Sequence, residues 1–422
     1  MEQAQKEIKI AIIGLGYVGL PLAIAFGKKY PTVGFDINTE RVIELKQGKD
    51  STLQASNLEL AAASHLILSS AVEAIALSNI YIVTVPTPVD EQKKPDLQAL
   101  LHASSLIASV LKKGDIVIYE STVYPGCTEE DCVPVLEKKS GLVFNQDFYC
   151  GYSPERINPG DKVNTLTTIK KITSGSTPGI ADTIDSLYKG IIQAGTYKAP
   201  SIKVAEAAKS IENAQRDINI SFVNELALIF DKMGIDTHDV LEAASTKWNF
   251  LPFKPGLVGG HCIGVDPYYL AHKASSLGHT PQVILSGRNV NDQMGVFVAQ
   301  KLTRLLSSKN ISTHGAKVLI LGVTFKENCP DTRNSKVFDI IEHLTKEGME
   351  VEAFDPFANA EEVWLKHKVH LITKLETYDG IVLAVAHDFF KALDYTQLKR
   401  NTNSIIFDTK AFLDKNMVDA RL

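Results

Sequence analysis

The side chain best suited to covalent chemistry is Cys262, which lies in the stretch GLVGGHCIGVDPYY from Gly256 to Tyr269. Four glycines, with Pro255 before the stretch and Pro267 within it, predict a loop. Glycines beside a thiol let a ligand approach the backbone closely, and a thiol can form covalent adducts with a carbonyl group. The alternative interpretation is a buried structural cysteine in a tight turn.

A second set of polar residues lies between Ile202 and about Met233, where neither proline nor glycine interrupts the chain. Apolar residues recur there at helical spacing, so we predict a long helix that joins two lobes and offers a dimer surface. A lysine and an asparagine one turn apart can hold an oxyanion, and a partly buried lysine can serve in acid–base chemistry. The alternative is a solvated polar face. The polar residues, three, four and three positions apart on one side, are Glu206, Lys209, Asn213 and Arg216.

The N-terminal part carries a dinucleotide-binding pattern. A largely β-branched run, Ile8–Ile13, leads into GLGYVG, which spans Gly14 to Gly19 and includes Tyr17 and Val18; a helical stretch follows. In this strand–turn–helix context, Gly14 makes the tight turn and Gly19 permits close packing of helix on strand. Gly16 lets the backbone meet a pyrophosphate at the helix N-terminus.

The acid expected to select the cofactor is Asp36, which ends the predicted strand Thr32–Phe35. A carboxylate about 20 residues beyond the glycines binds the ribose diol and repels a 2′-phosphate, so NAD is favoured over NADP. Arg41 is the nearby basic residue that would reverse this preference, unless it lies in the following helix.

Further strand–helix units follow, and ligands bind beyond the carboxyl ends of strands in open α/β sheets. The strand Ile80–Val85 breaks at Pro86-Thr87-Pro88, and Ile116–Tyr119 ends in Glu120-Ser121-Thr122. We therefore expect Thr84–Thr87 and Ser121-Thr122 to edge the cofactor site; turn formation and capping are the alternative roles. The loop from Gly151 to Arg156 contains Glu155, which is either a catalytic carboxylate or a solvated loop acid.

A second lobe repeats this alternation of strands and helices but lacks the G-x-G-x-x-G motif. Lys317–Leu321 reads as a buried strand, a helix follows from about Ser335 to Lys346, and three more apolar strands come after it. The sequence therefore predicts an α/β fold of two doubly wound Rossmann-like domains joined by a long central helix. We expect domains at 1–198, 199–310 and 311–422. Lys326 and Arg333 follow the first strand of this lobe, where they can meet phosphates or a base, or be surface charges.

Composition excludes several classes of protein. The 422 residues are 45% hydrophobic and 22% charged, with a net charge of -5, which argues against general nucleic-acid binding. The charged start MEQAQKEIKI lacks a secretory apolar segment, and no apolar run is long enough to cross a membrane. Five cysteines fit a reducing compartment, so we expect a cytoplasmic protein. Cys127 and Cys132 have no second pair or nearby histidine, so we expect no metal site.

Seven stretches, in order along the chain, resemble motifs of the UDP-glucose/GDP-mannose dehydrogenase family, over essentially the whole length. The resemblance is closest to the branch that oxidises UDP-N-acetylhexosamines, including enzymes of the Vi-polysaccharide type. The stretches are GLGYVGLPLA from Gly14, TVPTP from Thr84, ESTVYPG from Glu120, YSPERINPG from Tyr152, AEAAKSIEN from Ala205, GLVGGHCIGVDPYY from Gly256 and TFKENCPDTRN from Thr324.

The resemblance implies a four-electron oxidation of the sugar 6-hydroxyl to a carboxylate, with two NAD reduced, for a surface polysaccharide such as a capsule or O-antigen. It implies that Cys262 attacks the aldehyde to give a thiohemiacetal and then a thioester. Lys209 and Asn213 would stabilise oxyanions, and Asp266 would hold the lysine or a water. Glu155 would help activate the hydrolytic water, beside Thr122.

The same resemblance assigns ligand contacts and an expected homodimer or higher oligomer. It implies that NAD contacts Gly14, Gly16, Tyr17, Val18, Gly19, Asp36, Arg41, Thr84, Pro86, Thr87, Ser121, Thr122 and Arg333. It implies that the UDP-sugar contacts Glu155, Arg156, Lys209, Asn213, Arg216, Phe253, Pro255, Gly256, Gly260, Phe325 and Lys326.

Two departures bear on the substrate. Glucose enzymes of the family typically have GGSC, whereas this chain has His261 before Cys262, and the Asn213 to Asp217 pattern resembles the N-acetyl branch. We interpret His261 as structural, because adjacent side chains on an extended loop point apart. UDP-glucose, UDP-N-acetylmannosamine, a two-electron alcohol oxidation and a non-catalytic nucleotide-binding protein stay open as alternatives.

Overall fold

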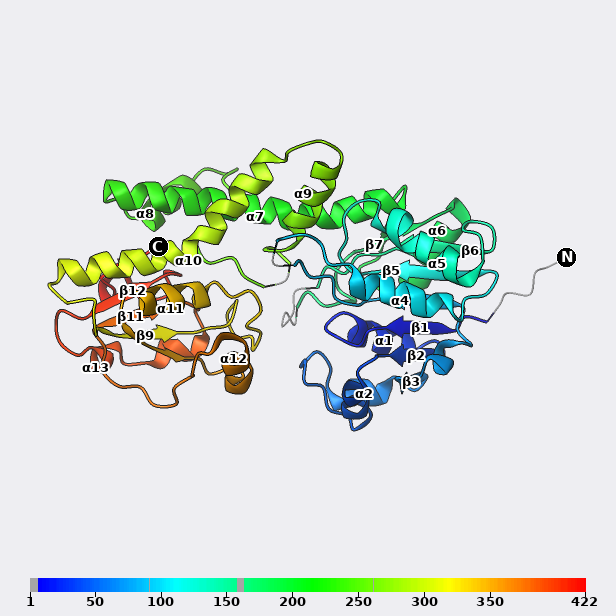
Figure 1. Cartoon of the computed structure of the whole chain (residues 1–422), viewed down its shortest axis with the longest axis horizontal. Helices are drawn as coiled ribbons and strands as arrows, with labels where there is room; N and C mark the ends of the chain where they lie inside the picture. The colour runs from blue at the N-terminus through cyan, green and yellow to red at the C-terminus, as the bar shows by residue number, and fades with distance from the viewer. Residues whose placement is uncertain (1–6, 91, 158–162, 261) are drawn as a thin grey trace. The chain divides into compact units, whose positions relative to one another are not determined.

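The structure, a computed structural model, describes residues 7–90, 92–157, 163–260 and 262–422. The chain divides into two compact units (Figure 1), each considered by itself. The first unit comprises residues 1–212 with 268–279, and the second comprises 213–267 with 280–422. The division falls inside two helices, α7 (Ile202–Met233) and α9 (Asp266–Ser276).

The first unit is built on an eight-stranded sheet of order β3-β2-β1-β4-β5-β6-β7-β8 (Figure 1). Neighbouring strands are parallel except β6 and β7, which are antiparallel. The strand order reverses between β1 and β4, which is where open α/β sheets bind ligands. The strands are β1 (Ile10–Ile13), β2 (Thr32–Phe35), β3 (Leu66–Ser69), β4 (Ile80–Val83), β5 (Asp115–Tyr119), β6 (Phe148–Tyr152), β7 (Lys171–Gly175) and β8 (Thr196–Lys198).

Helices cover both faces of this sheet, which explains why its central strands are apolar along their whole length. On one face, Ile12 and Ile82 pack in a core with α1 and α6. The ring centres of Phe26 and Tyr188 lie 5.6 Å apart in this core. On the opposite face, the Tyr119 hydroxyl hydrogen bonds to Ser104 of α4 at 2.7 Å. The helices are α1 (Gly19–Gly27), α2 (Thr39–Lys46), α3 (Asn57–Ala62), α4 (Gln98–Ala108), α5 (Val133–Ser140) and α6 (Pro178–Lys189), with a 3-10 turn at Val72–Ile75 and a π-helical turn at Thr128–Cys132.

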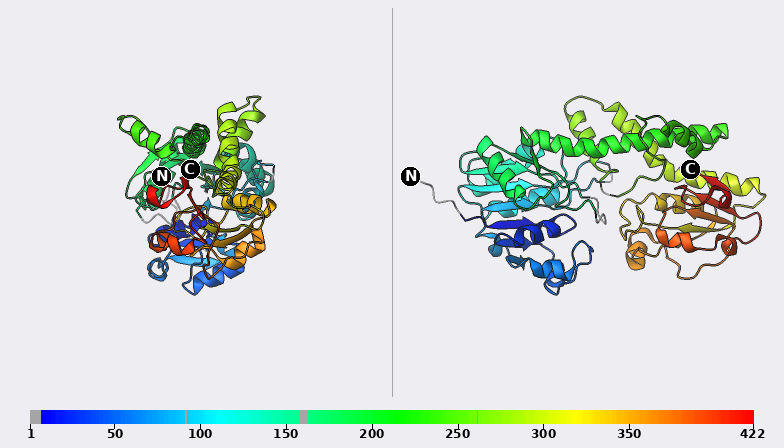
Figure 2. Two further views of the ribbon diagram at one scale, coloured as in Figure 1. Left: turned by 90° about the vertical axis from the view of Figure 1, so that its left-hand side faces the viewer. Right: turned by 180° about the vertical axis from the view of Figure 1, so that it is seen from behind.

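The second unit contains a five-stranded parallel sheet of order β10-β9-β11-β12-β13 (Figure 2). One face of the sheet packs under α10 and α11 and the other packs against residues that include Tyr378 and Phe390. Its elements are α8 (Thr237–Ser245), α10 (Gln282–Ser308), β9 (Lys317–Leu321), α11 (Val337–Lys346), β10 (Glu350–Phe354), α12 (Ala360–His367), β11 (Gly380–Leu383), α13 (Tyr395–Leu398), β12 (Ile405–Asp408) and β13 (Ala420–Arg421), with 3-10 turns at Asp388–Ala392 and Lys415–Met417.

The predicted α/β class with two Rossmann-like sheets is confirmed, and so is the long helix, because α7 runs for 32 residues. The predicted loop around Cys262 is too long at its C-terminal end. Helix α9 begins at Asp266, so Asp266–Tyr269 are helical. Pro267 does not prevent this, because proline fits the first helical turn, where an N–H has no intrahelical partner.

None of the helices in the described ranges is both long and apolar enough to cross a membrane. The same ranges contain no group of three or more histidine, cysteine, aspartate or glutamate residues placed to hold a metal ion.

Candidate functional site

The glycine loop after β1 has the geometry of an anion cradle. Gly14 has a φ of +99°, which an L side chain rarely adopts, and a Cβ at Gly19 would lie 1.8 Å from the Gly14 carbonyl oxygen. A Cβ at Gly16 would meet no atom within 4 Å, so this side of the loop is open. Helix α1 starts after Val18 without a side-chain cap. The open loop and uncapped N-terminus suit the pyrophosphate of a dinucleotide.

Asp36 holds this loop in place from the end of β2. Its Oδ2 accepts the Leu15 N–H at 2.8 Å, and its Oδ1 accepts the Asn38 N–H at 2.9 Å. Each carboxylate oxygen has a second lone pair, so a ribose diol can still bind. The predicted position of the acid is therefore compatible with NAD.

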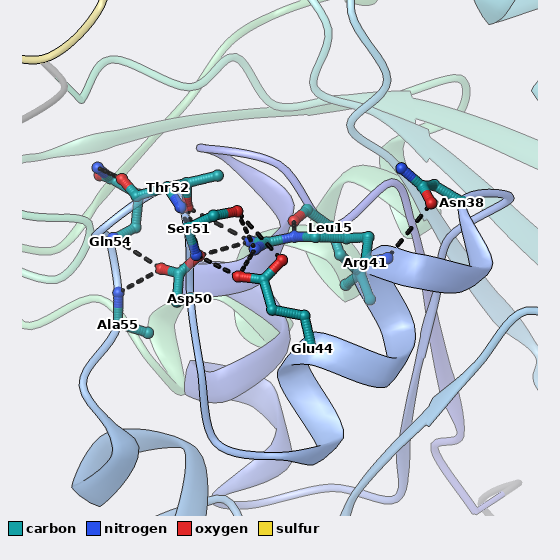
Figure 3. Close-up of polar contacts among 9 residues, drawn as sticks. All are labelled: Leu15, Asn38, Arg41, Glu44, Asp50, Ser51, Thr52, Gln54 and Ala55. Carbon is teal, nitrogen blue, oxygen red and sulfur yellow. Dashed lines mark hydrogen bonds and ion pairs between the residues drawn. The ribbon is translucent and has the colours of Figure 1, made fainter. Parts of the chain in front are cut away.

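Arg41 lies in α2, as the second of the two sequence interpretations has it, and its side chain is almost buried. Its Nε donates to the Leu15 carbonyl at 3.1 Å, and its terminal nitrogens bond to Asp50, Glu44, Ser51 and Thr52 (Figure 3). The guanidinium is thus used to join the glycine loop to the segment around Asp50.

Asp50 is the centre of that segment. Its Oδ1 accepts from Arg41 at 2.7 Å, and its Oδ2 accepts the N–H groups of Gln54 and Ala55 at 2.7 and 2.9 Å (Figure 3). Burial opposes ionisation of this carboxyl, but hydrogen bonds from Thr52 and Arg41 outweigh it and lower its pKa. No sequence motif indicated this contact; the only signal was a pair of opposite charges nine residues apart.

The predicted strand-end residues come together at the carboxyl edge of β1, β4 and β5. The Thr84 hydroxyl donates to the Gly14 carbonyl at 2.8 Å, and Thr87 donates to the Thr122 carbonyl at 2.7 Å. Ser121 donates to the Val85 carbonyl at 2.6 Å. These hydroxyls therefore make the turn contacts of the alternative interpretation while they shape the edge of the sheet where a cofactor would bind. Pro86 is exposed beside them.

Glu155 is only 6% exposed, which contradicts the interpretation as a solvated loop acid. Its Oε1 accepts the N–H groups of Arg156 and Ile157, and its Oε2 accepts from the buried Lys171 at 2.8 Å. The Arg156 guanidinium pairs with Glu212 at 2.7 Å. The remainder of the YSPERINPG motif, from residue 158, lies outside the described residues.

The polar side of α7 is buried at three of the four predicted positions. Glu206, Lys209 and Asn213 are 0%, 8% and 6% exposed, so the solvated-face alternative is wrong for them. Arg216 is exposed and Asp217 is buried, which corrects the predicted stripe: spacings of three to four residues continue it to position 217.

Glu206 reaches the loop before the π-helical turn, because its two oxygens accept the N–H groups of Gly126 and Thr128 at 2.5 and 2.9 Å. Burial raises the pKa of Glu206 to about 7, although these hydrogen bonds act to lower it. The sequence alone did not indicate this contact, which joins positions 78 and 80 residues apart.

In the second unit, Asn213 donates from Nδ2 to Asp266 Oδ2 at 2.5 Å, and Asp266 is 1% exposed. Asp266 is placed by the start of α9, because the Cys262 carbonyl accepts the Asp266 N–H at 2.9 Å. Cys262 is half-buried. Asn213 and Asp266, two residues with predicted catalytic roles, therefore lie in direct contact. The backbone of Cys262 begins the turn that carries Asp266. His261 lies outside the described residues.

The segment before Cys262 is clamped at two points. Asn224 of α7 makes two hydrogen bonds to the backbone of Gly256. Further along, the Gly260 N–H donates to the Arg333 carbonyl at 3.0 Å, and Asn334 donates to the Gly260 carbonyl at 3.0 Å. Gly260 has a φ of +78°, and a Cβ there would lie 2.9 Å from the Phe325 ring. The Arg333 guanidinium pairs with Asp331.

A pocket beside this segment is lined by three lysines, the acid Glu327 and an aromatic ring. The Lys326 ammonium lies 5.7 Å from the centre of the Phe325 ring. Lys336 pairs with Asp292 and Asp339, and Lys410 pairs with Glu327. Positive charge beside an aromatic face suits a nucleoside diphosphate. Phe253 and Pro255 precede the pocket; its lining includes Leu257, Gly259, Thr324, Phe325, Lys326, Lys336 and Lys410.

The loop after β9 contains a glycine and an acid like those of the glycine loop of the first unit. Here, however, their polar groups are hydrogen bonded within the protein. Gly322 has a φ of +87°, as Gly14 has +99°. Asp355 follows β10 and accepts the N–H groups of Val323 and Thr324 at 2.7 and 3.2 Å. His387 covers the same carboxylate at 3.1 Å, so the acid and the loop amides are satisfied within the protein.

Family models match three consecutive parts of the chain. They describe the NAD binding domain of the UDP-glucose/GDP-mannose dehydrogenase family at residues 8–192, its central domain at 203–293 and its UDP binding domain at 319–415. The glycine loop and Asp36 lie in the first match, Cys262 and most of α7 in the second, and Lys326 in the third.

Whole-chain relatives agree with this assignment. The chain is 57% identical to the UDP-N-acetyl-D-glucosamine 6-dehydrogenase of Pseudomonas aeruginosa, over 99% of this chain and 100% of the relative. It is 55% identical to the enzyme of the same name from Salmonella typhi, over 99% of both chains. The structure of UDP-D-ManNAc dehydrogenase from Pyrococcus horikoshii is similar, with a TM-score of 0.88, 30% identity and 98% coverage of each chain. The chain belongs to the UDP-glucose/GDP-mannose dehydrogenase family and contains its NAD binding domain.

Proposed function

We propose that the protein oxidises the 6-hydroxyl of a UDP-N-acetylhexosamine, UDP-N-acetylglucosamine or UDP-N-acetylgalactosamine, to the uronate with two NAD. The observation that carries this proposal is the 57% and 55% identity, over 99% of the chain, to enzymes named for UDP-N-acetyl-D-glucosamine. Relatives named for UDP-N-acetyl-D-mannosamine are less similar, for example 32% identical in Pyrococcus horikoshii and 33% in Methanococcus maripaludis, which makes that substrate the weaker candidate.

In the proposed reaction, the glycine loop after β1 and Asp36 would hold NAD, which would supply the hydride acceptor for both oxidations. The first step turns the C6 alcohol into an aldehyde. The Cys262 thiolate adds to that aldehyde, and the second oxidation leaves the sugar joined to the sulfur as a thioester. Water adds to the thioester carbon, the carbon–sulfur bond breaks, and the products are the carboxylate and the free thiol.

The other predicted residues have roles that suit their surroundings. Lys209 and Asn213 are buried on one side of α7, where a cation and an amide stabilise an oxyanion more strongly than in water. The Asn213–Asp266 contact fixes the amide, so its orientation is set before substrate binds. Glu155 activates the hydrolytic water near Thr122, and Lys326 holds the diphosphate.

We further propose that the protein works in the cytoplasm, where NAD and UDP-sugars are made, and supplies a uronate for a surface polysaccharide. We propose a homodimer that uses α7. This is supported by large apolar side chains left exposed along the helix, namely Val204, Ile211, Phe222 and Ile229.

The decisive experiment supplies limiting UDP-N-acetylglucosamine with excess NAD and counts NADH formed per sugar consumed. Two NADH per sugar are expected, and Cys262→Ser should lower uronate formation by on the order of a thousandfold or more. Cys329→Ser, a change at a buried cysteine of the same unit, serves as the control. One NADH per sugar would mean a plain alcohol dehydrogenase. Absence of NADH with the gluco, galacto, manno and glucose nucleotides would favour a non-catalytic binding protein.

A further inference from the structure

A buried cluster of charged side chains lies at the carboxyl edge of the first unit's sheet. The Lys171 ammonium, on the first residue of β7, donates to Glu120 at 2.7 Å and to Glu155 at 2.8 Å. The Tyr188 hydroxyl of α6 donates to the other oxygen of Glu120. Lys171 is 1% exposed, and Glu120 is fully enclosed. The four residues come from four different elements, because Glu120 follows β5 and Glu155 follows β6.

The antiparallel pairing of β6 with β7 is what brings these residues together. Tyr152 pairs with Ser174 and Gly151 with Gly175, so the first residue of β7 lies beside the loop that follows β6. Lys171 therefore reaches Glu155 although the two are 16 residues apart. If β7 were parallel to β6, a crossover connection would place its first residue at the opposite edge of the sheet, away from this loop.

The charges of the cluster do not cancel. Two carboxylates face one ammonium, and a buried excess of negative charge favours uptake of a proton. Burial raises the pKa of Glu120, and the neighbouring Glu155 adds to this, while Lys171 acts against it. Burial alone would lower the pKa of Lys171, but the two carboxylates raise it. Lys171 is therefore held as a cation between the two carboxylates.

We propose that Lys171 is a positioning residue that places a cation against Glu155 and fixes the orientation of its carboxyl group for thioester hydrolysis, with Glu120 and Tyr188 holding the lysine in place. This inference rests on the proposed function, in which Glu155 accepts a proton from the attacking water. Lys171 occupies one oxygen of Glu155, and two backbone N–H groups occupy the other. A carboxylate has about four acceptor sites, so one remains for water.

The cluster also has a merely structural interpretation, which makes different predictions. Buried ion pairs contribute little to stability compared with apolar residues of similar size, so stability alone does not account for a lysine here. A structural lysine would change the thermal midpoint and leave the pH dependence of turnover unchanged. A positioning lysine supplies the cation beside the Glu155 carboxyl group, so its removal changes the pH dependence of turnover. In the described part of the chain, other titratable groups near Glu155 include Glu120, Tyr188 and the Arg156–Glu212 ion pair.

The test measures kcat against pH for Lys171→Met in the full-length protein with NAD and the UDP-sugar. Without the ammonium, Glu155 is left buried beside Glu120, so the acidic limb of kcat should move to higher pH by roughly one unit or more. Hydrolysis should become the slow step, so mass spectrometry of acid-quenched enzyme should show the sugar acyl group accumulating on Cys262. Lys171→Arg keeps the charge and should keep the acidic limb near that of the wild type.

One further variant keeps the inference falsifiable if Lys171→Met does not fold. Glu120→Gln removes the second carboxylate and retains groups that can bond to Lys171 and Tyr188, so the acidic limb should stay or move to lower pH. Lys189→Met, at an exposed lysine of α6 paired with Asp185, is the matched control and should change nothing. The inference is overturned if folded Lys171→Met keeps the wild-type pH profile without the adduct, or if Glu120→Gln moves the limb upward.

Failure of the proposed function is recognised separately. If wild-type enzyme forms only one NADH per sugar, no thioester exists and the role of Glu155 is lost, whatever the Lys171 variants do. If wild type forms two NADH and Glu155→Gln turns over normally, the function stands and the inference about Lys171 fails.

Discussion

Asn224 and Gly256 are joined by two hydrogen bonds of opposite direction. Asn224 Nδ2 donates to the Gly256 carbonyl at 3.0 Å, and the Gly256 N–H donates to Asn224 Oδ1 at 2.8 Å. Asn291 of α10 accepts the second Nδ2 hydrogen at 2.7 Å and so fixes the orientation of the amide. One buried side chain of α7 thus holds the beginning of the segment that carries Cys262.

Asn224→Ala should therefore loosen the cysteine segment. Both backbone groups of the buried Gly256 lose their partners, which should cost about 2 kcal/mol of unfolding free energy, and kcat should fall with the enzyme still folded. Denaturant unfolding and steady-state kinetics check this. Asn219→Ala removes an amide that donates to the Gln215 carbonyl of its own helix, and it should leave both quantities unchanged. Equal kcat in the two variants would contradict the positioning role of Asn224.

Arg41→Met should destabilise the first unit, because it leaves Asp50 buried without its cationic partner. Loss of one member of a buried ion pair costs about 3–5 kcal/mol, and KM for NAD should rise because the Leu15 carbonyl loses its donor. The double variant Arg41→Met with Asp50→Asn should recover part of the stability. If the two single changes simply add in unfolding experiments, the ion pair does not couple these segments.

Asp36→Asn should weaken the preference for NAD over NADP, because it removes the negative charge that repels a 2′-phosphate. KM for NAD should rise on the order of tenfold, as expected for the loss of one hydrogen bond to a charged group. NADP should remain a poor cofactor, since the nearby Arg41 is bound to Asp50 and the Leu15 carbonyl. Glu40→Gln, at an exposed acid in the first turn of α2, is the control. Efficient use of NADP by Asp36→Asn would show that Arg41 moves to a phosphate.

Glu206 should make stability depend on pH between about 4.5 and 7. Its pKa in the folded protein is about 7, raised from 4.5 by burial, so folding takes up a proton in this window. Stability should therefore fall as pH rises from 4.5 to 7 and level off above 7, with a contribution of about 3 kcal/mol for a shift of this size. Glu206→Gln cannot ionise and should flatten that part of the profile. Identical pH profiles of unfolding for wild type and variant would contradict it.

The sequence predicted those elements whose pattern is local. β2, β9 and α7 lie where apolar runs, glycines and the absence of proline place them, and GLGYVG folds into the predicted strand–turn–helix. Local patterns fail where a contact joins distant segments. The Glu206 contacts span about 80 residues, and the Lys171–Glu120 pair spans 51. Lys171 carried no local signal either, because its strand reads KITSG and is not an apolar run.

Some residues could be placed by type but not by surroundings. The sequence placed Arg41 in the helix after Asp36 rather than at a phosphate, but its burial against Asp50 is what shows where the guanidinium lies. Arg216 was placed on the polar side of α7 from spacing alone. One turn of an α-helix contains 3.6 residues, so spacings of both three and four residues stay on one side. Over three turns the spacing therefore left open whether position 216 or 217 continues the buried side.

The closed loop after β9 bears on how this chain could be re-engineered. Both units have a glycine with positive φ after their first strand and an acid after the next strand. The second unit therefore has the backbone arrangement of a dinucleotide-binding loop. Introducing glycines there would not create a second redox lobe, because Asp355 and His387 already satisfy the groups that a cofactor would use. A designer would first have to remove the contacts that Asp355 makes with His387 and the loop amides, for example with His387→Gly, and only then widen the turn.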